Sequence, residues 1–217
     1  MSLAEYLALP SHRRIEIMDG EIKELSVQQV KHILVTRRIF RLLDTFTRNG
    51  ERWETFSQDT FTTQSPDDPN WVTGLFMPDV MVLDRAALKE WLASLGGKNA
   101  PIPIIPSFVV EVLSPSDLFT EVNRKVRRYL SLGVCVVWVI DPEDGVVYVY
   151  TPDAAMQVFQ SDAELRVEEL LASRCQSKRF LLSSNLIGQQ DEVGAMDNFL
   201  AVAVAEVYAN LTRLHAN

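Results

Sequence analysis

The chain of 217 residues has few of the features that mark secreted, fibrous or membrane proteins. Its only cysteines, Cys135 and Cys175, show no repeated spacing, which argues against a disulfide framework and favours a reducing compartment. Nine glycines and ten prolines exclude a fibrous or low-complexity protein. The N-terminus lacks the basic start and apolar core of a signal peptide, and no apolar run approaches the roughly 20 residues of a membrane span. We therefore expect a cytoplasmic protein that makes no contact with a membrane.

The chain also lacks the excess of basic residues that is usual in general nucleic-acid binders. Its 21 Lys and Arg against 29 Asp and Glu give a net charge of −8. Two short clusters are nevertheless basic, at residues 37–41 and 124–128. Solvated helix faces and contacts with phosphate account for such clusters about equally well. Charge alone therefore leaves the partner open.

The spacing of apolar residues predicts both helices and strands. Helices are expected over residues 2–9, 30–47, 85–95, about 118–132, and 195–214. Strands are expected over 14–26 around an Asp19–Gly20 turn, 52–64, 78–84, 107–113, 134–140 and 146–151, with further edge strands at 156–160 and 164–170 and a loop over 65–74. This order predicts an α/β or α+β protein in which helices flank a sheet.

Two carboxylates stand in apolar segments that read as strands, Asp79 in "FMPDVMVLD" and Glu111 in "PSFVVEVLSPSD". Side chains alternate along a strand, so Asp79 shares a face with Met81, and Glu111 shares a face with Val109. If the two strands pair with these faces together, both carboxylates converge on an otherwise apolar surface. Such a pair of oxygen ligands suits a hard divalent cation such as Mg²⁺.

The helix expected after the "SPSD" turn, with Ser116 or Asp117 as its N-cap, supplies a cation. Its buried stripe is expected to comprise Phe119, Val122, Val126, Tyr129 and Leu130. At 100° per residue, Lys125 lies about 60° from Val122, at the flank of this stripe. Lys125 is therefore the cation of the 124–128 cluster that can lean over the sheet toward Glu111.

Taken together, "MPDVMVLD", "PSFVVEVLSPSD", "KVRRYLSLGV" and "VVWVIDPEDGVVYVY" resemble the Uma2 family of the restriction-endonuclease-like superfamily, whose signature is PD-(D/E)-x-K. "EIMDGEI" near the N-terminus and His32 at the start of the first long helix fit the same pattern. The resemblance covers about residues 3–151. It implies a restriction-endonuclease-like mixed central sheet and hydrolysis of phosphodiesters, with DNA as the substrate.

The resemblance also implies roles for particular residues. Asp79 and Glu111 would be the metal ligands, for Mg²⁺ or Mn²⁺, and catalytic acids of the signature. Leu113 stands where the signature has its lysine, so the resemblance implies that Lys125 takes over that catalytic role from the next helix. Glu21 and His32 are possible supporting residues. Glu16 and Glu21 also fit ordinary exposed strand positions, and Tyr129 fits the core.

Residues past 151 match the family pattern poorly, so we expect two parts. Residues 1–151 form the restriction-endonuclease-like core, and residues 152–217 form a C-terminal extension with edge strands and an apolar helix. That helix is expected to pack on the core or on a partner chain, which suggests a homodimer. A second hypothesis is a catalytically inactive binding or assembly module that retains the nuclease-like fold.

Overall fold

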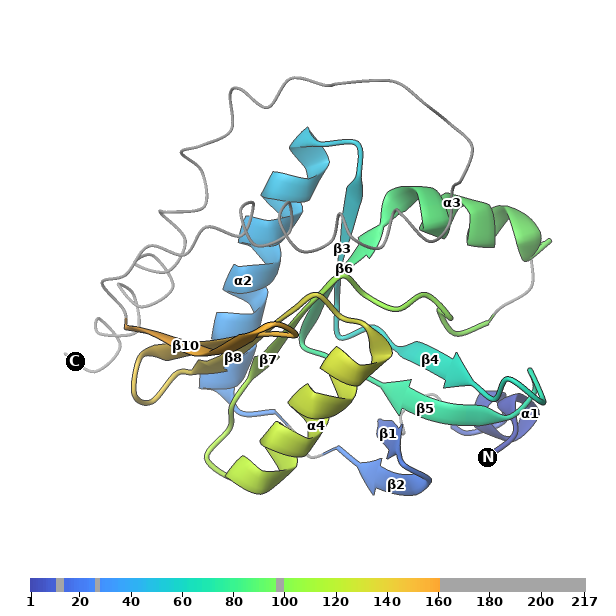
Figure 1. The fold of residues 1–217 in the computed structure, drawn as a ribbon, viewed down its shortest axis with the longest axis horizontal. Helices are drawn as coiled ribbons and strands as arrows, with labels where there is room; N and C mark the ends of the chain where they lie inside the picture. Colours follow the sequence, from blue (N-terminus) through green and yellow to red (C-terminus); the bar gives the residue numbers. More distant parts are fainter. Residues whose placement is uncertain (11–13, 26–27, 97–99, 161–217) are drawn as a thin grey trace.

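The computed structural model of the chain describes residues 1–10, 14–25, 28–96 and 100–160. Within these residues the chain forms two β-sheets with helices packed around them (Figure 1). The strands of the larger sheet are β3 (Trp53–Ser57), β6 (Val80–Asp84), β7 (Phe108–Val112), β8 (Val136–Asp141), β9 (Val146–Thr151) and β10 (Ala154–Gln160). Their order is β10-β9-β8-β7-β6-β3. Because β7 and β8 are parallel and the other neighbours are antiparallel, the sheet is mixed, as predicted.

A second, antiparallel sheet was not predicted. Its strands are β1 (Ile15–Met18), β2 (Glu21–Glu24), β4 (Phe61–Gln64) and β5 (Val72–Phe76), in the order β2-β1-β5-β4. Asp19 and Gly20 both adopt positive φ in the tight turn between β1 and β2, which confirms the predicted hairpin. The start of β5 lies within residues 65–74, which were expected to form a loop. The polar residues before β5 suggested a loop there, although Val72 and Leu75 are deeply buried.

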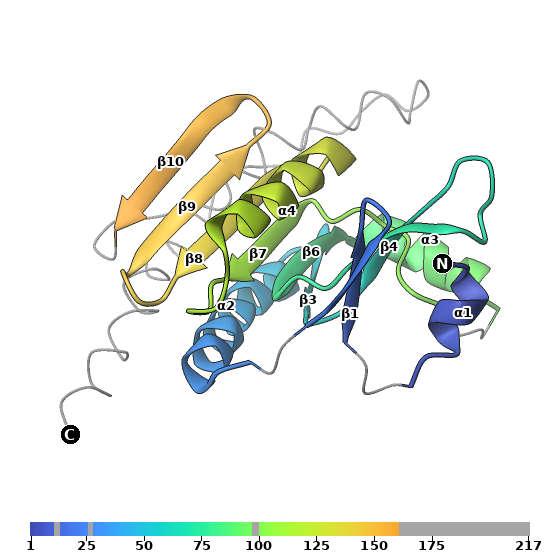
Figure 2. The ribbon, with the colours of Figure 1, turned by 90° about the horizontal axis from the view of Figure 1, so that it is seen from below.

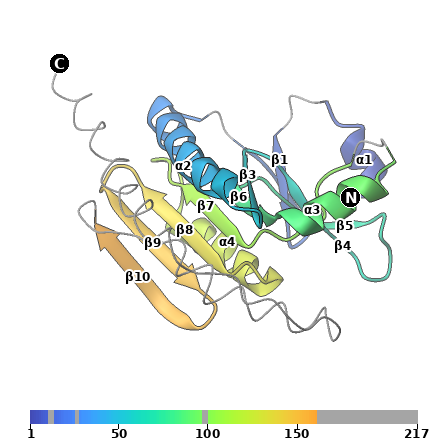
Figure 3. The same cartoon turned by 90° about the horizontal axis from the view of Figure 1, so that it is seen from above.

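Four helices are described: α1 (Leu3–Leu7), α2 (Val30–Asn49), α3 (Arg85–Ser94) and α4 (Phe119–Leu132). Figures 2 and 3 show α2 and α4 on opposite faces of the six-stranded sheet. Val35 and Ile39 of α2 pack with Val110 and neighbouring residues in one apolar cluster. Val126 of α4 packs with Val109 and neighbouring residues in the other cluster. The alternating residues of β7 therefore face two different cores, which explains its continuous apolar run.

The start of α4 differs from the prediction. Its N-cap is Leu118, which makes no side-chain capping bond, so Ser116 and Asp117 were wrong as N-cap candidates. Asp117 instead accepts a hydrogen bond from the backbone N–H of Ser114, at 2.7 Å. Phe119 lies in the first helical turn and is 73% exposed, although the predicted stripe included it. The helix ends as predicted at Gly133, whose φ is 96°.

The remaining expectations concern Cys135, the membrane and the extension. Cys135 is buried, and Cys175 lies outside the described residues. Each helix of the described residues is too short or too polar to cross a bilayer. The expected edge strand at 156–160 is part of β10, at the border of the larger sheet. The predicted edge strand over 164–170 and the predicted helix over 195–214 lie outside the described residues.

Gly74 of β5 offers a test of the smaller sheet. A Cβ atom at this position would lie 2.5 Å from Oγ1 of Thr63 and 2.6 Å from the ring of Phe76. Phe76 is buried and stacked on Phe61, so it has little room to move. We expect Gly74→Ala to lower the free energy of unfolding by about 1–3 kcal/mol, measured by urea denaturation.

Gly50 provides the matched control, because the nearest atom to a Cβ there is 3.9 Å away and its φ is −110°. Gly50→Ala should change the free energy of unfolding by no more than a few tenths of a kcal/mol. Equal losses in the two variants would contradict the close packing of Gly74.

Candidate active site

A pocket of about 710 Å³ lies at one end of the larger sheet. Its walls come from the β1–β2 hairpin, the start of α2, the residues just before β6, the end of β7 and the first half of α4. Asp79, Glu111, Lys125, His32 and Glu21 all line it. The structure therefore gathers every residue that the sequence singled out for the site around one cavity.

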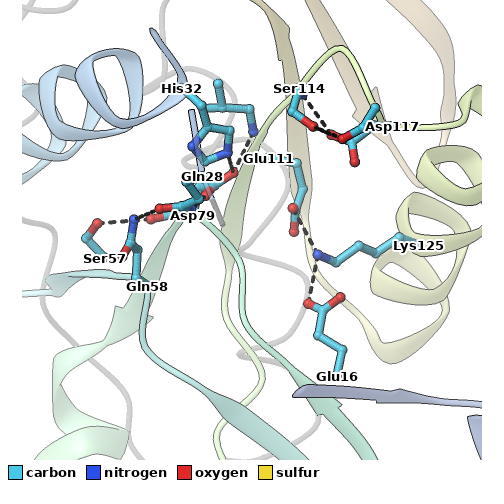
Figure 4. Close-up of polar contacts among 12 residues, drawn as sticks. Glu16, Gln28, His32, Ser57, Gln58, Asp79, Glu111, Ser114, Asp117 and Lys125 are labelled. Atoms are coloured by element: carbon cyan, nitrogen blue, oxygen red, sulfur yellow. Dashed lines mark hydrogen bonds and ion pairs between the residues drawn. The ribbon is translucent and has the colours of Figure 1, made fainter. Parts of the chain in front are cut away.

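Glu111 of β7 is held by two donors from α4 (Figure 4 shows the first). Lys125 Nζ donates to its Oε2 at 2.9 Å, and the Tyr129 hydroxyl donates to its Oε1 at 2.6 Å. Burial raises the pKa of Glu111 to about 7, opposed by the charge of Lys125 and reinforced by the charges of Asp79 and Glu16. Glu111 therefore releases its proton less readily than an exposed glutamate does.

Lys125 lies between two carboxylates. Its Nζ is 2.8 Å from Oε1 of Glu16 and 2.9 Å from Oε2 of Glu111. Burial lowers the pKa of Lys125, but the two carboxylates outweigh it and leave the pKa well above its ordinary value. The ammonium group therefore stays charged. The contact with Glu111 confirms the prediction that Lys125 leans over the sheet toward this residue.

Asp79 directly precedes β6 and is fixed by donors from three sides. Its Oδ2 accepts from the backbone N–H of Val112 at 2.8 Å and lies 3.1 Å from Nε2 of His32. Its Oδ1 accepts from Nε2 of Gln28 at 3.1 Å, and Gln58 donates in turn to Gln28 at 2.7 Å. Since the side chain is buried, these bonds hold the carboxylate in one orientation.

His32 is buried in the first turn of α2. Burial lowers the pKa of His32, but the hydrogen bond with Asp79 and the charges of Asp79 and Glu111 raise it above its ordinary value overall. Its Nδ1 has no hydrogen-bond partner among the described residues. His32 therefore acts on the site through Nε2 and Asp79.

The pairing of β6 with β7 brings the two carboxylates to the same end of the sheet. Met81 is opposite Val109, so these two residues share a face as predicted. Asp79, which was expected on that face with Met81, does not lie on it. The partners of the two carboxylates nevertheless differ (Figure 4). Asp79 turns toward α2, on one side of the sheet, while Glu111 turns toward α4, on the other. They share the pocket because β6 begins and β7 ends at the same end of the sheet.

Sequence reasoning missed three residues of this network, Glu16, Tyr129 and Gln28. Glu16 is only 8% exposed, so its interpretation as an ordinary exposed strand position is wrong. Alternation in β1 favoured exposure of Glu16, since Ile15 and Ile17 are buried on the opposite face. Tyr129 is buried as expected, but its hydroxyl also donates a hydrogen bond to Glu111.

Glu21 lies at the rim of the pocket instead of beside Glu111. Its side chain is 73% exposed and is 2.7 Å from Nη2 of Arg124. Asp19 also pairs with Arg124 and with Arg128, and Lys23 pairs with Glu121. These ion pairs tie the β1–β2 hairpin to α4. A solvated helix face was one interpretation of the 124–128 cluster. These ion pairs show that Arg124 and Arg128 are not freely solvated.

The residues fit a hydrated divalent cation. Among the described residues, no three His, Cys, Asp or Glu side chains form a ready cage for a metal ion. Mg²⁺ needs no such cage, because it is usually held by one or two carboxylates, several waters and substrate phosphates. Among the described residues, Lys125 pairs with both Glu16 and Glu111. Burial first, and the charges of Asp79 and Glu16 after it, raise the pKa of Glu111. Asp79 and Glu111 would hold the ion.

Comparison with known proteins identifies the family. Residues 3–179 match the Uma2 family model, which is described as "Putative restriction endonuclease". The chain belongs to the Uma2 family. The match runs past residue 151, where the resemblance seen in the sequence ended.

A solved structure supports the fold of this Uma2 protein. It is the crystal structure of a "putative nuclease belonging to DUF820 from Anabaena variabilis ATCC 29413", 23% identical in sequence, with a TM-score of 0.63. The alignment covers 80% of the present chain and 92% of the other. No curated protein matched the chain. At this identity the likeness shows the shared fold alone.

The raised pKa of Glu111 predicts how stability depends on pH without metal. Between its ordinary value of 4.5 and about 7, the folded protein keeps a proton that the unfolded chain releases. The free energy of unfolding should therefore fall as pH rises through this range, by at most about 3 kcal/mol from this group. Glu111→Gln, which has no such proton to release, should flatten the curve measured in EDTA by urea denaturation.

His32 requires a restricted range for this comparison. Because its pKa is also raised, its contribution is lost only above the ordinary value of 6.5, so the slopes are compared from pH 4.5 to 6.5. Glu90→Gln, at an exposed position of α3, is the control and should follow the wild-type curve. A Glu111→Gln curve as steep as that of the wild type would contradict the assignment.

Proposed function

We propose that this Uma2 protein is a Mg²⁺- or Mn²⁺-dependent nuclease that hydrolyses phosphodiester bonds, with DNA as its substrate. The observation that carries the proposal is the largely buried Glu111, whose side chain is 14% exposed, paired with Lys125 in the pocket that also contains Asp79. Perturbed titratable groups gathered in a pocket are characteristic of active sites. The family description and the printed name of the similar structure point to the same class of reaction.

The proposed centre assigns the metal to Asp79 and Glu111. A bound Mg²⁺ ion neutralises charge on a phosphoryl group and makes a bound water more acidic. Each carboxylate still has acceptor capacity, since Oδ1 of Asp79 and both oxygens of Glu111 each accept one described hydrogen bond. The bonds from Val112 and Tyr129 hold the two carboxylates in place.

Lys125 is the proposed cation of the chemical step. Its ammonium group would orient the attacking water or stabilise negative charge that develops on the phosphate. Glu16 and Glu111 fix its position from two sides, which limits the motion of a long side chain. Leu113 occupies the usual lysine position of the signature, so the cation reaches the site from α4 instead of from β7.

An inactive binding or assembly module is the second candidate. It is favoured by the partners that Asp79 and Lys125 already have within the chain itself. Asp79 accepts from three residues, and Lys125 is neutralised by two carboxylates, without any ligand. The apolar sequence over 195–214 suits a module whose role is assembly.

Cleavage assays with purified protein distinguish the two candidates. We expect Mg²⁺ or Mn²⁺ to support cleavage of at least one substrate in a panel of single-stranded, duplex and branched DNA, and EDTA to stop it. Asp79→Ala and Glu111→Ala should abolish cleavage and metal binding, and Lys125→Met should lower the rate at least about 100-fold. Glu90→Ala, on exposed α3, should cleave as the wild type does.

Metal binding is measured separately by calorimetry. A protein that cleaves no substrate and binds neither metal would refute the nuclease proposal. Variants at Asp79 and Glu111 that change only stability or assembly would establish the inactive module.

The proposal includes a homodimer and the division of the chain near residue 151. Both are supported by the apolar sequence over 195–214, which is expected to pack on the core or on a partner chain. Light scattering should give twice the 24.6 kDa of one chain, and a chain ending at residue 160 should lose this mass if the segment joins two copies. A monomeric full-length chain would contradict the dimer.

A further inference from the structure

We propose that Arg14 binds a phosphate group of the DNA substrate, next to the centre formed by Asp79 and Glu111. This inference rests on the proposed function, since it names the contact that places a DNA strand in that pocket. Neither the family description nor the motif of the signature assigns a role to Arg14.

The alternation of β1 places Arg14 in the pocket. Ile15 and Ile17 are buried in an apolar cluster, while Arg14, Glu16 and Met18 all line the pocket. Arg14 precedes Glu16 by two residues, a separation of about 7 Å along an extended strand. Arg14 therefore lies one strand repeat along the chain from Glu16, the residue that contacts the proposed catalytic cation Lys125.

Arg14 differs from the other cations of the pocket in its partners. Among the described residues that line it, the basic side chains are Arg14, Lys23, His32, Arg124 and Lys125. The last four each contact a carboxylate, of Glu121, Asp79, Glu21 and Glu111 respectively. Within the described part of the chain, Arg14 alone of the five has no acidic partner.

The contact that Arg14 does make is weak. Its Nε donates to Sδ of Met77 at 3.3 Å, and a thioether is a poor acceptor for a charged donor. The side chain is partly buried, so this guanidinium loses some of its water without gaining a counter-charge. Such a cost is offset when an anion binds.

A phosphate is the anion that suits this position. The planar guanidinium presents paired N–H donors that match two phosphate oxygens. Lys125 cannot serve as the general phosphate anchor, because Glu16 and Glu111 already hold it from two sides. Arg14 therefore supplies the binding charge, and Lys125 is left for the chemical step.

Binding is measured by fluorescence anisotropy with labelled single-stranded and duplex DNA in Mg²⁺. The Glu111→Gln background keeps the DNA intact. Adding Arg14→Gln should weaken binding about 10- to 100-fold, as expected for loss of a charged hydrogen bond. The slope of log K against log salt should become shallower by about 0.7–0.9, the value for one phosphate contact. Arg14→Lys keeps the charge but loses the paired N–H donors of the guanidinium group. Its affinity for DNA should therefore lie between those of Arg14 and Arg14→Gln.

Lys89→Gln is the matched control, because Lys89 is exposed on α3, lies outside both basic clusters and does not line the pocket. It removes the same charge and should leave affinity and salt slope unchanged. Thermal melts establish that each variant is folded. In the active protein, Arg14→Gln should raise KM for DNA and largely preserve kcat.

The outcomes separate this inference from the proposed function. The inference is overturned, even if DNA is cleaved, if folded Arg14→Gln binds with unchanged affinity and salt slope. It is also overturned if Lys89→Gln loses as much affinity as Arg14→Gln does. Binding that depends on Arg14 without cleavage in Mg²⁺ or Mn²⁺ supports the phosphate contact and refutes the nuclease. A chain that neither binds nor cleaves DNA overturns both.

Discussion

The site depends on one constraint, the burial of the Glu111 carboxylate in a central strand. β7 lies between β6 and β8, and the residues on either side of Glu111 in this strand, Val110 and Val112, are buried. An ionised carboxylate in such a place loses its hydration, which is why the pKa of Glu111 rises to about 7. Lys125 and Tyr129 offset part of this cost, and both come from α4. The position of α4 on the sheet is therefore linked directly to the charge state of Glu111.

The second sheet completes the arrangement. It carries β1, and β1 brings Glu16 to the far side of Lys125. The exposed ion pairs of Arg124 with Asp19 and Glu21 hold the same hairpin against α4. Exposed pairs of this kind contribute little to overall stability. Their consequence is local, since they set where one wall of the pocket stands relative to the helix that carries Lys125.

The sequence predicted the strongly periodic parts of this molecule and missed those that depend on contacts between distant segments. The apolar run of β7 and the amphipathic pattern of α4 were sufficient to locate Glu111 and to orient Lys125 toward it. Glu16 was assigned to an exposed position, because its burial depends on α4 lying across β1, and no local pattern records that contact. The N-cap of α4 was wrong for a similar reason, since Asp117 bonds to Ser114 within the preceding turn. Tyr129 has the spacing of a core residue, and spacing cannot show where a hydroxyl points.

The balance of charge in the pocket bears on how an acidic protein could bind the proposed DNA substrate. Among the described residues, six acids and five bases line the cavity, and four of those bases already contact acids. A phosphate that enters the metal-free pocket therefore meets a surface with excess negative charge. Under the proposed function, a divalent cation at Asp79 and Glu111 would reverse this at the reacting group, and Arg14 would add positive charge elsewhere in the same pocket. In this scheme the metal is needed for the approach of the substrate as well as for its hydrolysis, so the net charge of −8 says little about the ligand that the pocket accepts.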